Sequence, residues 1–170
     1  MNDRVPLTSA MWVERFEHLF KNIQQMRMQD LPFLHTGITV KAFGFEPHQQ
    51  GFLGVVLTPW FMNLIFVPEV LTQEQVGSRQ FLQLPAGTYD FIVNYEDPIG
   101  FYWTCSLFSP VLEFEDQQAA EQTAQYALLA VLQPDHSSAK DQYQAEKPLA
   151  ERLQQPMSRR AWLQGKFLRD

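Results

Sequence analysis

The sequence has few basic residues and a single cysteine. Its 170 residues include 13 Lys and Arg against 19 Asp and Glu, which gives a formal net charge of −6 at pH 7. Because an acidic chain has no general attraction for a phosphate backbone, nucleic acid is not an expected partner. One thiol, Cys105, cannot form an internal disulfide, which fits a reducing cytoplasm.

The short motifs of common metal, nucleotide and catalytic sites are absent as well. Neither H-E-x-x-H nor C-x-x-C occurs, and there is no Walker A, G-x-G-x-x-G or G-x-S-x-G pattern. Cys105 lies in an apolar strand pattern, which favours a buried structural thiol, although a pairing with a distant histidine stays open. We therefore expect no catalytic residue, no metal ligand, no cofactor and no enzymatic activity.

Long apolar runs are also missing. The longest, residues 60–67, is interrupted by Asn63, whereas a membrane-spanning helix needs about 18 uninterrupted apolar residues. The first residues show no cationic start followed by an apolar block, so no signal peptide is expected. These absences predict a cytoplasmic protein without a membrane span.

What the sequence does contain is the pattern of an α+β domain. Apolar residues at three- and four-residue spacings predict helices over residues 9–28 and 114–132. Between them, alternating apolar segments with hairpin-length links predict an antiparallel sheet, because parallel strands need longer crossovers. The expected fold is an N-terminal helix, an antiparallel sheet of five to six strands, and a C-terminal helix packed on the sheet.

The composition changes near residue 132. Residues 1–132 carry six Lys and Arg against 14 Asp and Glu, whereas residues 133–170 carry seven against five. Prolines and small polar residues in the second part are typical of a linker. We predict one acidic domain over residues 1–132, followed over residues 133–170 by a polar linker and a flexible, weakly basic tail.

Three segments are unusual for a plain core. A T-P-W segment follows an apolar strand at residues 58–60, an L-P-x-G hairpin lies at residues 84–87, and C-S-L-x-S-P precedes a helix at residues 105–110. Their order resembles that of the HybE family of [NiFe]-hydrogenase assembly chaperones, and the loop at residues 30–35 is similar too. The resemblance covers residues 16–132.

The resemblance implies a cytoplasmic chaperone that binds the precursor of a [NiFe]-hydrogenase. The expected client is the small subunit with its twin-arginine export signal. The alternative is a scaffold of the same maturation complex that acts on the large subunit or on other assembly factors. A homodimer is a further possibility, because exposed aromatic rings can serve self-association.

The segment around Pro59 is the best candidate for a partner surface. A proline inside an apolar strand pair requires a sheet edge, a bulge or a tight corner, which can aim the residues that follow it outward. Packing of Trp60 and Phe61 in the core is an equally good interpretation. The candidate partner-binding residues are Thr58, Pro59, Trp60, Phe61, Asn63, Ser109 and Pro110.

The tail contains a further segment that bears on function. Residues 158–164 read Ser-Arg-Arg-Ala-Trp-Leu-Gln, which is similar to the twin-arginine consensus Ser-Arg-Arg-x-Phe-Leu-Lys. No apolar block follows, so an export signal is not expected here. One interpretation is that these residues are a basic, loosely amphipathic segment without a specific role. The other is that they mimic the twin-arginine signal of the client. The residues concerned are Ser158, Arg159, Arg160, Trp162 and Leu163.

Overall fold

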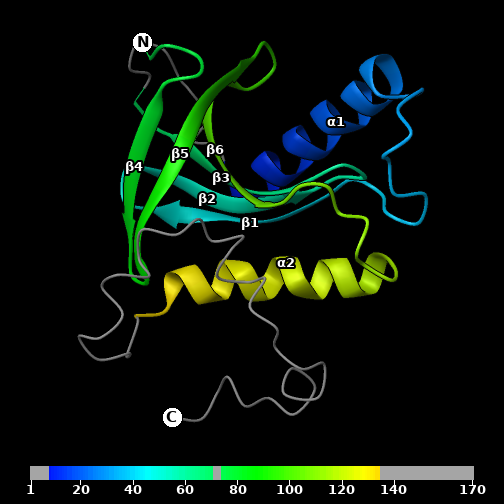
Figure 1. Ribbon diagram of the computed structural model, residues 1–170. Coiled ribbons are helices and arrows are strands. Elements are labelled where there is room, and N and C mark those ends of the chain that lie inside the picture. The colour runs from blue at the N-terminus through cyan, green and yellow to red at the C-terminus, as the bar shows by residue number, and fades with distance from the viewer. Residues whose placement is uncertain (1–7, 71–73, 135–170) are drawn as a thin grey trace.

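The computed structural model describes residues 8–70 and 74–134. A six-stranded antiparallel sheet lies between two helices, with α1 (Ser9–Arg27) on one face and α2 (Gln117–Leu132) on the other (Figure 1). The strands are β1 (Lys41–His48), β2 (Gly51–Leu57), β3 (Met62–Pro68), β4 (Arg79–Leu84), β5 (Gly87–Glu96) and β6 (Gly100–Phe108), in the order β1-β2-β3-β6-β5-β4. The predicted α+β class is confirmed.

Helix α1 covers the half of the sheet that contains β1, β2 and β3. The side chain of Thr8 caps it by accepting a hydrogen bond from the amide of Met11. Its buried stripe is mostly aromatic, and the ring of Phe16 stacks on Phe45 of β1 with 4.7 Å between centroids. Phe16 also meets Tyr102 of β6 edge-on, at 5.5 Å. Burial of these rings is the main force that holds α1 on this face.

Helix α2 covers the opposite face with small side chains. Alanines and a valine three or four residues apart are buried, which allows the helix to approach the sheet closely: Ala120, Ala124, Ala127 and Val131. The helix begins at Gln117 rather than at the predicted residue 114, because the Asp116 carboxylate caps it by accepting from the Ala119 amide at 2.8 Å.

A β-bulge in β1 directs neighbouring residues towards the two opposite faces of the sheet. The register shifts between Gly44 and Glu46, and both Gly44 and Phe45 have positive φ angles, of 77° and 59°. The positive φ angle favours glycine at position 44, and a Cβ there would also force the end of the Leu128 side chain of α2 to shift. The bulge turns Phe45 towards α1, where it is fully buried.

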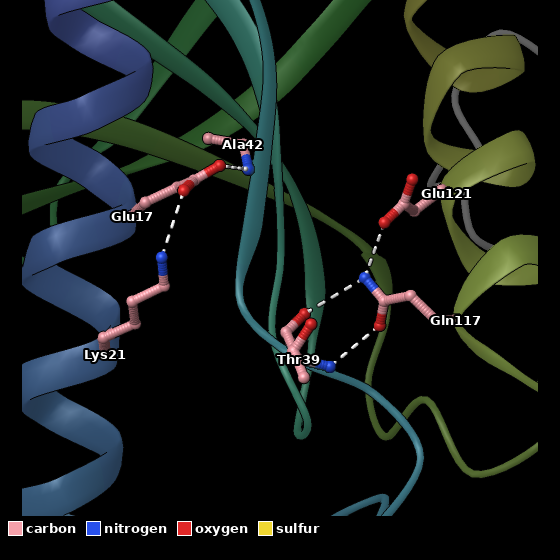
Figure 2. Close-up of polar contacts among 6 residues, drawn as sticks. All are labelled: Glu17, Lys21, Thr39, Ala42, Gln117 and Glu121. Atoms are coloured by element: carbon pink, nitrogen blue, oxygen red, sulfur yellow. Dashed lines mark hydrogen bonds and ion pairs between the residues drawn. The ribbon is translucent and has the colours of Figure 1, made fainter.

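Side chains from both helices hold the outer edge of the sheet at β1 (Figure 2). Glu17 of α1 accepts a hydrogen bond from the amide of Ala42 at 3.2 Å. Gln117 of α2 accepts from the amide of Thr39 at 2.8 Å and donates to its carbonyl oxygen at 3.5 Å. These contacts satisfy backbone groups that no strand pairs with, and they tie the start of α2 to the chain that enters β1.

Candidate partner-binding site

Three loops meet at the end of the sheet where α2 begins (Figure 1). Residues 58–61 connect β2 to β3, and Met62 pairs with Phe108, so the chain leaving β6 emerges beside that turn. The loop after α1 joins them through a hydrogen bond from the amide of His35 to the carbonyl of Pro59, at 2.8 Å. We call residues 31–35, 58–61 and 109–114 the three-loop surface.

His35 is the residue that connects all three loops. Its backbone amide reaches Pro59, while its ring nitrogen Nε2 lies 2.7 Å from the carbonyl oxygen of Phe114. The other ring nitrogen accepts a hydrogen bond from the amide of Gly37 at 3.0 Å. Because Nδ1 accepts, Nε2 carries the proton and donates to Phe114. The sequence had drawn attention to His35 only through the family resemblance of residues 30–35. The contacts of His35 could not be predicted from the sequence, because its partners lie far along the chain.

Replacing His35 with alanine should therefore loosen the three-loop surface. The variant loses the hydrogen bonds to Phe114 and from Gly37, and we expect a loss of about 1–2 kcal/mol in the free energy of unfolding, measured in urea. Amide hydrogen exchange at residues 111–116 should accelerate. His35→Asn is the matched control, since its side-chain oxygen can still accept from Gly37. Equal stability of the alanine variant and the wild-type chain would contradict this role.

Thr58 and Pro59 lie beneath the surface and shape the turn. The Thr58 hydroxyl donates to the carbonyl of Phe61 at 3.1 Å and accepts from the amides of Trp60 and Phe61 at 3.2 and 2.9 Å. Thr58 is fully buried, so its hydroxyl is used within the turn. Both candidate residues are thus buried, and their structural part is to position the neighbouring residues of the turn.

Trp60 and Phe61 pack in the core, which is one of the two roles considered for them. Each ring packs edge-on against Phe20 of α1, with centroid distances of 6.4 and 5.2 Å. Both stay half-buried, so part of each ring faces solvent. Asn63, two residues on, is half-buried as well, and its Oδ1 accepts no hydrogen bond from the described residues. The rings belong to the α1 core and still offer apolar surface.

Ser109 and Pro110 line a shallow depression beside that turn. Its volume is about 280 Å³, and its lining comprises Phe108, Ser109, Pro110, Leu112 and Glu113. Leu112 is 52% exposed, and Phe33 in the neighbouring loop is 41% exposed. The depression therefore combines apolar side chains with one carboxylate, and the sequence alone had not singled out Leu112 or Phe33.

The loops at this end of the molecule carry acidic side chains, and Lys41 lies nearby at the start of β1, where it pairs with Leu57. The loop segments 28–40, 58–61 and 109–116 contain four Asp and Glu residues and no Lys or Arg. Within residues 8–70 and 74–134, the three ion pairs lie on other elements: Glu17–Lys21, Arg27–Glu96 and Arg79–Asp90. The Asp30 and Glu113 carboxylates belong to none of these pairs, so they are available to an incoming cation.

The remaining segments lie away from this surface. The turn at residues 85–86 contacts the other end of α2, where the amide of Ala86 donates to the carbonyl of Val131 at 3.2 Å. Cys105 is buried in the core beneath α2, and burial raises the pKa of its thiol to about 11, with a smaller contribution from Asp90. Very little thiolate exists near neutral pH, which is unfavourable for a nucleophile.

Two further properties bear on function. Neither helix in the described part of the chain combines the length and apolar character needed to cross a membrane. Among the same residues, no three His, Cys, Asp or Glu side chains cluster as metal ligands would. The signal-like residues Ser158, Arg159, Arg160, Trp162 and Leu163, and residues 135–170 of the predicted linker and tail, lie outside the described residues.

Comparison with known proteins places this fold in a family. The sequence pattern that defines the family "[NiFe]-hydrogenase assembly, chaperone, HybE" matches residues 11–165. The hydrogenase expression/formation protein HupJ of Bradyrhizobium diazoefficiens is 30% identical over 154 residues, which cover 91% of this chain and 88% of that protein. The "probable rubredoxin HupJ" of Rhodobacter capsulatus is 31% identical over 125 residues, which are 72% of this chain but 45% of that longer protein.

A solved structure agrees with the sequence relatives. The solution structure of HybE from Escherichia coli superposes with a TM-score of 0.59 and 27% sequence identity, and the match covers 74% of this chain and 83% of that one. The resemblance inferred from the ordered segments at residues 58–60, 84–87 and 105–110 is thereby confirmed. The chain belongs to the HybE family of [NiFe]-hydrogenase assembly chaperones.

Proposed function

We propose that this chaperone binds the precursor of a [NiFe]-hydrogenase small subunit in the cytoplasm, by the twin-arginine signal of that precursor. The three-loop surface is the observation that supports the proposal. It offers apolar area at Phe33 and Leu112, with the Glu113 carboxylate beside Leu112 and Asp30 directly before residues 31–35. No ion pair within residues 8–70 and 74–134 neutralises either carboxylate. A signal with an arginine pair and apolar neighbours matches both properties.

The proposed mechanism is non-covalent binding, with no catalysed reaction. An arginine guanidinium donates several hydrogen bonds to carboxylates, and apolar side chains of the client gain from leaving water in the depression beside Pro110. While the signal is held, it is shielded from other partners until the client is released. Such an interface is partly electrostatic, so its affinity should fall as salt screens the charges.

The direct experiment is binding of the purified protein to a labelled peptide that carries a small-subunit twin-arginine signal, at low and high salt. Saturable binding that weakens at high salt supports the proposal. If the peptide does not bind, but the mature large subunit or another assembly factor is retained, the scaffold alternative is the better account. A peptide with both arginines replaced by glutamine controls for purely apolar binding.

Two substitutions on the three-loop surface should weaken peptide binding by roughly tenfold each, which corresponds to about 1.4 kcal/mol. Leu112→Ala removes exposed apolar area, and its control is Leu129→Ala on α2, since the two leucines are 52% and 55% exposed. Glu113→Gln removes a carboxylate, and its control is Glu69→Gln, which follows β3 at the opposite end of the sheet.

Because all four side chains are exposed, stability should change by less than about 0.5 kcal/mol in each variant. Differences in peptide binding can then be read without correction for unfolding. Should the Leu112 and Leu129 variants bind the peptide equally well, the client would contact a different surface.

A further inference from the structure

We infer that the three-loop surface is occupied, in the absence of a client, by residues 158–163 of the same chain. The inference rests on the proposed function only for its consequence, which is competition with the client. The contact itself is intramolecular, and it can be measured without any client.

Charge and chemistry are complementary between the two partners. Residues 158–163 read Ser-Arg-Arg-Ala-Trp-Leu, which places two adjacent guanidinium groups before an aromatic and an aliphatic side chain. The three-loop surface presents Glu113 next to Leu112 and the depression beside Pro110. Guanidinium–carboxylate hydrogen bonds and burial of Trp162 can therefore form together.

Three other carboxylates on the described domain are less suitable. The carboxylates of Glu17, Asp90 and Glu96 are already paired with Lys21, Arg79 and Arg27. An arginine pair that bound there would have to displace a cation that is already in place. At the three-loop surface no Lys or Arg occurs in the loop segments 28–40, 58–61 and 109–116, so no displacement is needed.

The chain is long enough to reach this surface. Helix α2 contains 16 residues and is about 24 Å long; it starts at the three-loop surface and ends beside Ala86 at the far side of the sheet. Residues 135–157 lie between the last described residue and Ser158. Even at the helical rise, the shortest of the common conformations, this segment would span about 35 Å, and fully extended it would span about 75 Å.

A tethered ligand of this kind competes efficiently. An effective concentration of order 1 mM for the tethered segment reduces client affinity roughly tenfold if the isolated segment binds with a Kd of about 100 μM. The client signal would then have to displace Arg159 and Arg160, and a weak or incomplete signal would fail to do so. The surface would also be shielded from unrelated basic peptides.

The test compares two charge-matched variants of the full chain. R159Q/R160Q removes the arginine pair, and K147Q/R152Q removes two cations outside the motif. Backbone amide chemical shifts of ¹⁵N-labelled protein are recorded without client. We expect R159Q/R160Q to change the shifts of Ser109, Val111, Leu112 and Glu113, and K147Q/R152Q to leave them unchanged. Equal changes in both variants, or none in either, would overturn the inference.

Client binding gives the second readout. The labelled signal peptide should bind R159Q/R160Q, and a chain that lacks residues 156–170, roughly three- to tenfold more tightly than it binds wild type or K147Q/R152Q. If all four proteins bind the peptide equally, the tail inference fails while the proposed function stands. If none binds it, the proposed function fails, and the shift comparison still decides whether the tail occupies the surface.

Discussion

Replacing Phe16 with alanine is expected to lower the free energy of unfolding by about 3–5 kcal/mol. The ring is fully buried between α1 and the sheet, where it stacks on Phe45 and meets Tyr102 edge-on. Its removal leaves a cavity that the bulged β1 and the packed helix cannot close without losing other contacts. Urea unfolding followed by far-UV circular dichroism measures the change.

Met26→Ala on the same helix is the control for Phe16→Ala. The Met26 side chain is 83% exposed, so its truncation should change stability by less than about 0.5 kcal/mol. A loss below about 1 kcal/mol in the Phe16 variant would be incompatible with α1 packed on this face of the sheet. Because alanine favours a helix at least as well as phenylalanine or methionine, helix propensity cannot explain a loss in either variant, and a loss of similar size in both would contradict the packing account.

Replacing Trp60 with alanine should reduce binding of the signal peptide about thirtyfold or more, which corresponds to about 2 kcal/mol. Trp60 is half-buried against Phe20, and the exposed part of its ring belongs to the three-loop surface. Aromatic rings held rigidly by one wall of a core lose little conformational freedom on binding, which favours them as contact residues.

Trp60→Ala will also cost stability, so its control must lose stability too. Phe52 of β2 is half-buried on the same α1 core, where it contacts Trp12 at a centroid distance of 6.0 Å, but it lies towards the opposite end of the sheet. Phe52→Ala should therefore weaken the fold and leave peptide binding unchanged, when binding is measured at a temperature where both variants are folded. If the two variants bind the peptide equally well, Trp60 serves the core alone.

The three-loop surface, which we propose as the client site, lies on loops that leave a rigid sheet. The sheet and its two cores supply rigid ends to each loop, and hydrogen bonds of His35 join the loops to one another. Surfaces of this kind open at low energetic cost compared with the core. We therefore propose that a client binds and leaves without unfolding the domain.

Short stretches of sequence were sufficient to predict the helices and hairpins. Periodic apolar residues predicted a helix over residues 9–28, and α1 spans Ser9–Arg27, because amphipathic spacing is a local property. The turn chemistry at residues 85–87 predicted a hairpin, and Leu84 pairs with Gly87. The start of α2 was predicted three residues early, since several acids before Gln117 suit a helix start and only the Asp116 hydrogen bond distinguishes them.

Only the tertiary structure decided which strands and which faces meet. Local patterns cannot state that β6 inserts between β3 and β5, because pairing between distant strands depends on the whole sheet. Nor could they assign α1 and α2 to opposite faces: both helices carry an apolar stripe, and neighbouring residues Val55 and Val56 belong to different cores. The same long-range contacts bring His35 to Pro59 and Phe114, so segments that are separate in the sequence form one surface.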